Sequence, residues 1–172
     1  GLLLVQWLKH VGATVIGTVS TPDKAALAKD AGADHVLFYK SEDVAARVRD
    51  ITGGAGVRVS FDGIGMSTWE TSLAATGRRG MIVSYGNAGG PVSGVNLGVL
   101  AQKGSLFVTR PTLFDYYADP VERQAGADYV FDMFRQGVIS ANIGQTSALE
   151  DVAQAHRDLE AGKTVGATVL RP

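Results

Sequence analysis

Short runs of apolar, mostly β-branched residues recur along the chain, and polar stretches of similar length separate them. The runs are Thr14–Val19, His35–Tyr39, Val57–Asp62, Met81–Tyr85 and Ser105–Thr109. Their nearly continuous apolar character is typical of strands that are buried on both faces of a parallel sheet. The pattern therefore predicts five buried strands.

The stretches between these runs carry signals for the starts and ends of helices. Thr21-Pro22-Asp23 offers an N-cap, a proline at the first helical position and an early acid, and Gly32 ends that helix. Further helices are predicted to begin at Ser67-Thr68-Trp69-Glu70, Asp119-Pro120 and Ser147-Ala148-Leu149-Glu150, and to end near Gly77, Gly137 and Gly162. Strands that alternate with helices in this way indicate an α/β fold with a doubly wound, Rossmann-like parallel sheet. We expect residues 1–172 to form a single domain of this kind.

The first element departs from this alternation. Leu2–Val11 has a helical pattern that Gly12 ends, and no strand comes before it. In a doubly wound dinucleotide domain the first strand is central, and its turn carries the phosphate-binding glycines. Without that strand the sheet would have a gap, and its two neighbours would expose unpaired backbone groups. We therefore expect a domain that lacks its first strand and glycine-rich loop, as part of a longer chain.

Composition and charge narrow the classes of function. Hydrophobic residues make up 45% of the chain and charged residues 19%, as in an ordinary globular protein. The net charge of -1 gives no overall attraction to nucleic acid or to an anionic membrane. The chain has no cysteine, which excludes disulfides, a cysteine-ligated zinc and a thiol nucleophile. The apolar start, Gly1–Leu8, is too short to span a bilayer and lacks a cleavage site, so we expect a cytoplasmic protein.

The residues that follow the first predicted strand bear on the choice of cofactor. An NAD site places an acid at this strand end to hold the ribose 2′-hydroxyl, and that acid would repel a 2′-phosphate. Here Ser20 and Thr21 follow the strand, and the first acid is Asp23. Their hydroxyls and amides lie at a helix N-terminus, and Lys24 could add a positive charge. The alternative is a simple helix cap beside a solvated lysine.

Six segments match one family pattern: Thr14–Ser20, Lys24–Ala28, Gly32–Val36, Ile51–Gly54, Gly80–Asn87 and Gln102–Thr112. With them the chain closely resembles the NADPH:quinone oxidoreductases, the zinc-free, zeta-crystallin-like branch of the medium-chain dehydrogenase/reductase superfamily. The resemblance extends over essentially the whole chain, and Gln102–Thr112 is its most specific part. It implies that NADPH is the cofactor.

The resemblance also assigns roles to individual residues. It implies that Ser20, Lys24 and Tyr39 surround the 2′-phosphate, and Gly1 matches the last glycine of the phosphate loop. It further implies a cofactor contact by Ile64, a nicotinamide-side wall formed by Gly86 and Asn87, and backbone contacts to the nicotinamide amide by Pro111, Thr112 and Leu113. From the residues alone, Tyr39 could equally be an edge aromatic, and Gly86-Asn87 an ordinary turn.

Three other polar residues could be functional, but a structural role explains each of them at least as well. Asp62 follows a strand and precedes Gly63, which favours a turn or cap acceptor over a catalytic acid. Arg110 could be a structural or subunit-interface residue as readily as a substrate clamp. His156 lies in an amphipathic pattern without a nucleophile motif, which favours helix packing.

The function implied by the resemblance is hydride transfer from NADPH to a quinone or related enone. No residue of this chain is given a catalytic role, and the chain by itself is expected to be inactive because half of the substrate cleft is missing. The alternatives are a zinc-type alcohol dehydrogenase cofactor domain and a non-catalytic, NADPH-binding or structural crystallin-like protein. The resemblance implies a homodimer through the edge strand 105–109. Nucleic-acid binding is not expected, because the chain has no basic and aromatic stripe.

Overall fold

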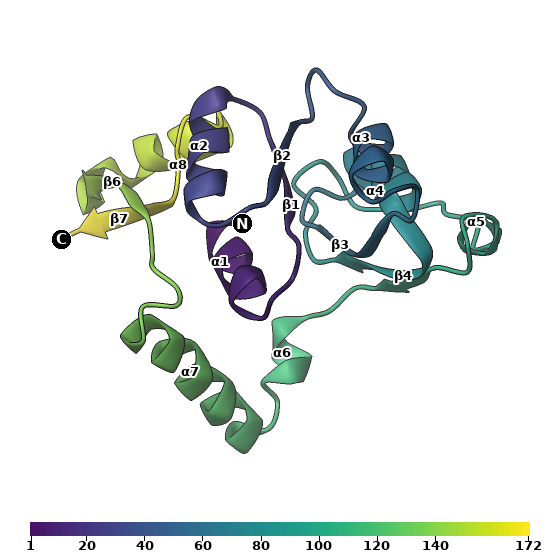
Figure 1. Cartoon of the computed structure of the whole chain (residues 1–172). Helices are drawn as coiled ribbons and strands as arrows, with labels where there is room; N and C mark the ends of the chain where they lie inside the picture. Colours follow the sequence, from purple (N-terminus) through teal and green to yellow (C-terminus); the bar gives the residue numbers. More distant parts are fainter. The chain divides into compact units, whose positions relative to one another are not determined.

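The computed structural model describes all 172 residues, and the chain forms two compact units. The first unit combines the two ends of the chain, Gly1–Val36 and Asp128–Pro172, and the second is Leu37–Ala127. In Figure 1 the first unit comprises the purple start of the chain and its green-to-yellow end. Each unit has its own apolar core.

The first unit contains two small sheets and the helices that accompany them. Its elements are α1 (Leu2–His10), β1 (Ile16–Val19), α2 (Pro22–Asp30), β2 (His35–Phe38, which ends in the second unit), β6 (Ile143–Ala148), α8 (Val152–Glu160) and β7 (Ala167–Arg171). Strand β1 pairs with β2, and β6 pairs in parallel with β7. Val15, Ala28 and Ala33 form the buried core. Gln6 fastens α1 to the segment before β6, since its side-chain carbonyl accepts the Ser140 amide at 2.7 Å.

The second unit is built on a three-stranded parallel sheet. Its elements are α3 (Val44–Ile51), β3 (Val57–Asp62), the 3-10 turn η1 (Met66–Thr68), α4 (Trp69–Ala75), β4 (Thr76–Ser84), α5 (Gly98–Gln102), β5 (Phe107–Thr109), α6 (Leu113–Tyr116) and the start of α7 (Pro120–Arg135). The strand order is β3-β4-β5. Helix α4 packs on β3 and β4, and α3 lies beside α4 (Figure 1). Trp69, Leu73, Ile82 and Leu106 form the core.

The predicted α/β character and parallel pairing are confirmed. Strand β1 pairs only with β2, and β3 pairs only with β4, so each keeps one unpaired edge. The predicted starts of α2 and α7 are also correct. The Thr21 hydroxyl accepts the Lys24 amide, and the Asp119 carboxylate accepts the Val121 amide at 2.6 Å.

Helix α4 begins at Trp69, within the predicted Ser67–Glu70 motif, but the motif makes no capping bond, and the Thr68 hydroxyl donates to Asp62. The start predicted at Ser147 is displaced. Ser147 belongs to β6, and a 3-10 turn, Leu149–Asp151, separates that strand from α8. At Ser147 the pairing of β6 with β7 prevails over the local capping pattern. Strand β4 is also longer than predicted, because Thr76 pairs with Val57.

Candidate functional site

The candidate phosphate-binding residues of the first unit lie where β1 passes into α2. Ser20 follows β1, Thr21 is the N-cap, and Lys24 lies in the first turn with its side chain half-buried. The Thr21 hydroxyl reaches the Lys24 amide only at 3.4 Å, and Pro22 has no amide hydrogen to offer. The Lys24 ammonium forms no ion pair within the chain. Amides of a first helical turn have no partner within the helix, so this end is suited to hold an anion.

Gly1 occupies the equivalent place at α1. It is the N-cap, and its carbonyl accepts the Val5 amide at 3.0 Å. No atom lies within 4 Å of the position that a Cβ would take at this residue. The first-turn amides of α1 have no partner within the helix, as at α2, which suits an anion.

Tyr39 belongs to the second unit, immediately after β2, and its side chain is 54% exposed. The turn that carries it is held by Glu42. One carboxylate oxygen of Glu42 accepts the Phe38 amide at 2.5 Å, and the other pairs with the Arg47 guanidinium at 3.3 Å. A flat aromatic face is thus presented to solvent from a fixed turn, available for stacking.

Asp62 ends β3 and holds the loop that follows it. Its carboxylate is buried, with 6% of the residue exposed, and one oxygen accepts the amides of Ile64 and Gly65, both at 2.9 Å. From the start of α4, the Thr68 hydroxyl donates at 2.9 Å and the Ser72 hydroxyl at 2.7 Å. The predicted role of Asp62 as a turn acceptor is confirmed. In each of these hydrogen bonds the carboxylate is the acceptor.

The electrostatics of Asp62 follow from these bonds. Burial acts to raise the pKa of the Asp62 carboxyl, but the hydrogen bonds from its four donors outweigh burial and hold the pKa below its ordinary value. The group is therefore a fixed negative charge at neutral pH. Because each donor stabilises the charged form, the carboxylate is a rigid acceptor rather than an acid.

The loop after β3 is joined to the loop after β4 through their backbones. The Gly89 amide donates to the Ile64 carbonyl at 2.7 Å, and the Met66 amide donates to the Gly90 carbonyl at 2.8 Å. Glycine is required at this junction, since a Cβ on Gly86 would overlap the Gly63 carbonyl. Ile64, Gly86 and Asn87 are thus brought together at the ends of β3 and β4.

Arg110 connects the third loop of this sheet to the same place. Its guanidinium donates to the Ser84 carbonyl, at the end of β4, across 2.9 Å. Pro111, Thr112 and Leu113 follow directly, and Thr112 is the N-cap of α6. Beside Asn87 and Arg110 lies a hollow of about 440 Å³ that also involves Trp69, Val92 and Val108. Of the nicotinamide-side candidates, Asn87 therefore borders a largely apolar recess whose one cationic group is Arg110.

A larger hollow, of about 710 Å³, lies in the first unit between α1, α2 and residues 138–142. None of the predicted cofactor residues lines it. Gln6 and Lys9 contribute to its wall, but Gln6 is bonded to Ser140, and Lys9 is paired with Asp34 at 2.8 Å. We therefore assign no site to this hollow.

Sequence reasoning missed the partners of Asp62 and the bond made by Arg110. Thr68 and Ser72 are four residues apart, which puts their hydroxyls on one side of the helix start. That spacing, downstream of an aspartate followed by Gly-x-Gly, was a readable signal. The Arg110 bond spans 26 residues and left no local trace in the sequence.

Comparison with known proteins agrees with this arrangement. Residues 1–118 match the family described as "Zinc-binding dehydrogenase". The chain belongs to the zinc-binding dehydrogenase family. Within this family the quinone oxidoreductase of Pseudomonas aeruginosa is 50% identical over the whole chain, and the 2-haloacrylate reductase of a Burkholderia species is 42% identical. The resemblance to quinone oxidoreductases is thereby confirmed.

Comparison with solved structures extends the similarity to the fold. The Escherichia coli quinone oxidoreductase, solved as a complex with NADPH, aligns over the whole chain with a TM-score of 0.96 and 45% identity. The chain spans 53% of that structure, 53% of the Pseudomonas aeruginosa relative and 52% of the 2-haloacrylate reductase. A Rossmann-like cofactor domain is thus the fold class of this chain. No helix in it has both the length and the apolar character to cross a membrane.

Proposed function

We propose that this chain is the NADPH-binding part of an oxidoreductase that transfers hydride from NADPH to a quinone or a related enone. The observation that carries the proposal is the strand end at β1, where Ser20, Thr21 and the unpaired Lys24 replace the acid of an NAD site. A family neighbour complexed with NADPH, at 45% identity, supports the same cofactor.

The residues of the first unit fit the phosphates of such a cofactor. The Ser20 and Thr21 hydroxyls and the first-turn amides of α2 would bind the 2′-phosphate, and Lys24 would neutralise it. The N-terminus of α1, at Gly1, would face the pyrophosphate. In the second unit, the exposed ring of Tyr39 is available to stack near the adenine.

The loops of the second unit fit the nicotinamide half. NADPH supplies the hydride when bound. Ile64, Gly86 and Asn87 would hold one side of the nicotinamide, and the backbone of Pro111, Thr112 and Leu113 would bind its amide group. The bonds between these loops restrict their movement, so the chain's contribution is to orient the ring and exclude water rather than to exchange protons.

The substrate class rests on the relatives. Proteins named quinone oxidoreductase and 2-haloacrylate reductase both act, by their names, on electron-poor conjugated double bonds. A zinc-type alcohol dehydrogenase is the weaker alternative, since the named alcohol dehydrogenase from Geobacillus stearothermophilus is 25% identical. We further propose that the protein acts in the cytoplasm as a homodimer joined along β5, whose outer edge has no partner in the chain.

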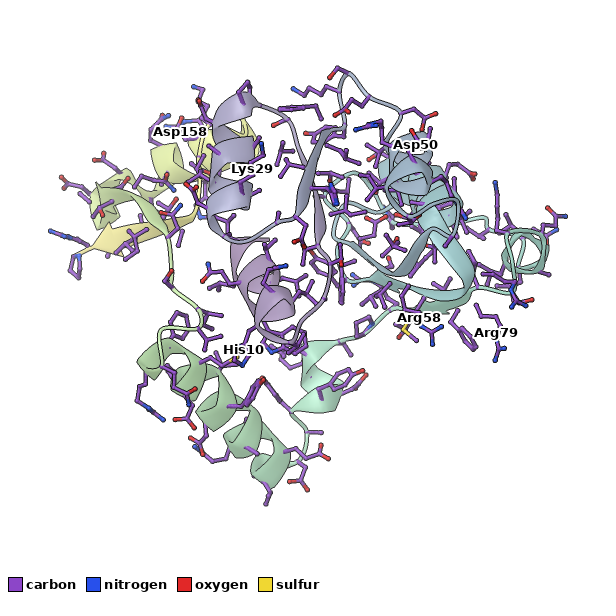
Figure 2. All side chains as sticks on the ribbon, viewed as in Figure 1. His10, Lys29, Asp50, Arg58, Arg79 and Asp158 are labelled. Carbon is purple, nitrogen blue, oxygen red and sulfur yellow. The ribbon has the colours of Figure 1, made fainter.

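The cofactor assignment is tested by removing the charge of Lys24. In the full-length gene product, Lys24→Ala should weaken NADPH binding by about tenfold or more and leave NADH binding within about twofold, because only NADPH carries the 2′-phosphate. Isothermal titration with each nucleotide measures both constants. The control is Lys29→Ala, which removes an exposed lysine from the last turn of α2 (Figure 2). Equal loss with NADH, or no loss with NADPH, would contradict the assignment.

A further inference from the structure

We propose that Asp62 is a positioning residue whose carboxylate fixes the location of the whole nicotinamide side, including residues that it does not touch. The proposal rests on the cofactor role given above to Ile64, Gly86 and Asn87. It goes beyond a local turn, because the bonds made by Asp62 continue through the backbone into the next loop.

Asp62 fixes the backbone of the loop that follows it. Its Oδ1 atom accepts the amides of Ile64 and Gly65, each at 2.9 Å, so the backbone on both sides of the Ile64 carbonyl is fixed. Gly65 adopts a φ of +92°, a conformation that side chains other than glycine rarely adopt. Glycine at position 65 therefore lets the loop follow this path, and the carboxylate holds the loop on it.

Backbone hydrogen bonds then join this loop to the loop after β4. The Ile64 carbonyl accepts the Gly89 amide at 2.7 Å, and the Gly90 carbonyl accepts the Met66 amide at 2.8 Å. Gly86 lies against the Gly63 carbonyl with no space for a side chain between them. The loop carrying Gly86 and Asn87 thus has no independent position, and it moves with the loop that Asp62 holds.

The start of α4 anchors the carboxylate itself. Thr68 and Ser72 donate to it from the start of α4, and α4 packs its Trp69 and Leu73 into the core. The chain of contacts therefore runs from the core, through α4 and Asp62, to the two loops. A carboxylate is suited to this place because it accepts from all four donors at once, whereas an amide side chain can accept at only one atom.

The test compares the two halves of the cofactor in the full-length gene product. Asp62→Asn should lower the quinone-dependent kcat about tenfold and weaken NADPH binding about threefold or more. Binding of adenosine 2′,5′-bisphosphate, which lacks the nicotinamide half, should stay within about twofold of wild type. The matched control is Asp50→Asn, on α3 of the same unit, where the carboxylate is 72% exposed (Figure 2).

Ser72→Ala keeps the proposal testable if Asp62→Asn does not fold. It removes one donor and leaves the loop sequence intact, so it should lower kcat by about threefold with the bisphosphate constant unchanged. Wild-type kcat and NADPH binding in a folded Asp62→Asn protein, or in Ser72→Ala, would overturn the positioning role. So would a parallel loss of bisphosphate binding, which would indicate general damage.

The proposed function fails in a different way. In that case the wild-type protein itself would bind neither NADPH nor the bisphosphate, or would bind NADH equally well. A failure of the Asp62 proposal leaves wild-type binding intact and shows only in the variants. The two results can therefore be told apart in one set of titrations.

Discussion

At the scale of single residues, the glycines between the β3 and β4 loops are the sharpest constraint. A Cβ on Gly86 would overlap the Gly63 carbonyl, whereas a Cβ on Gly17 would meet only Ala33, at 3.9 Å. We expect Gly86→Ala to lower the free energy of unfolding by about 1–3 kcal/mol, since both loops must shift. Gly17→Ala is the control and should have no such cost. Urea unfolding followed by the fluorescence of Trp7 and Trp69, one in each unit, measures both, and wild-type stability in Gly86→Ala would contradict the close approach of the loops.

At the scale of elements, the outer edge of β5 decides how copies of the protein associate. Phe107 is 55% exposed on this three-residue strand, which pairs only with β4. If β5 pairs with its copy, Phe107→Lys should move the full-length protein from dimer to monomer, because two like charges would meet at the new edge. Sedimentation equilibrium at tens of micromolar measures the change.

The control for this edge is Leu159→Lys on α8, where the leucine is 57% exposed and lies in the other unit. It introduces the same charge in place of a similarly exposed apolar side chain. We expect it to remain dimeric. A dimer that survives Phe107→Lys but not Leu159→Lys would place the interface elsewhere.

At the scale of the whole molecule, two carboxylates make the free energy of unfolding depend on pH in the acid range. The bond from Lys9 and then the Val15 amide lower the pKa of Asp34 in the first unit, and the pKa of Asp62 is lowered in the second. A lowered pKa means that the folded state binds fewer protons than the unfolded state. The stability contributed is then complete above about pH 4 and is lost as the pH falls through the folded-state values.

The two tryptophans allow each unit to be followed during an acid titration. Trp7 lies in the first unit, and Trp69 in the core of the second. In a Trp7→Phe background, Asp62→Asn should make the Trp69 signal less dependent on pH below about 4, because the titrating group has been removed. Asp34→Asn in the same background is the control and should alter that signal less. An unchanged acid transition in Asp62→Asn would show that other groups control it.

The sequence predicted an element correctly where the interactions that define the element are local in the chain. Helix α2 was predictable because its N-cap and proline act within four residues. The start predicted at Ser147 was wrong because the competing partner, β7, lies about 20 residues away. Helix α4 begins within its predicted motif, but the expected capping bond is absent and the Thr68 hydroxyl donates to Asp62.

The sequence by itself determined the alternation of strands and helices, the acid-free strand end at Ser20, and the family to which these belong. These features depend on residue type and on neighbours in the chain, so the sequence alone is enough to predict them. Only the tertiary structure decided that Asp62, Ser72 and the glycine loops form one connected support. Their bonds join residues from separate elements, and no periodicity in the chain records which backbone groups will meet once those elements pack.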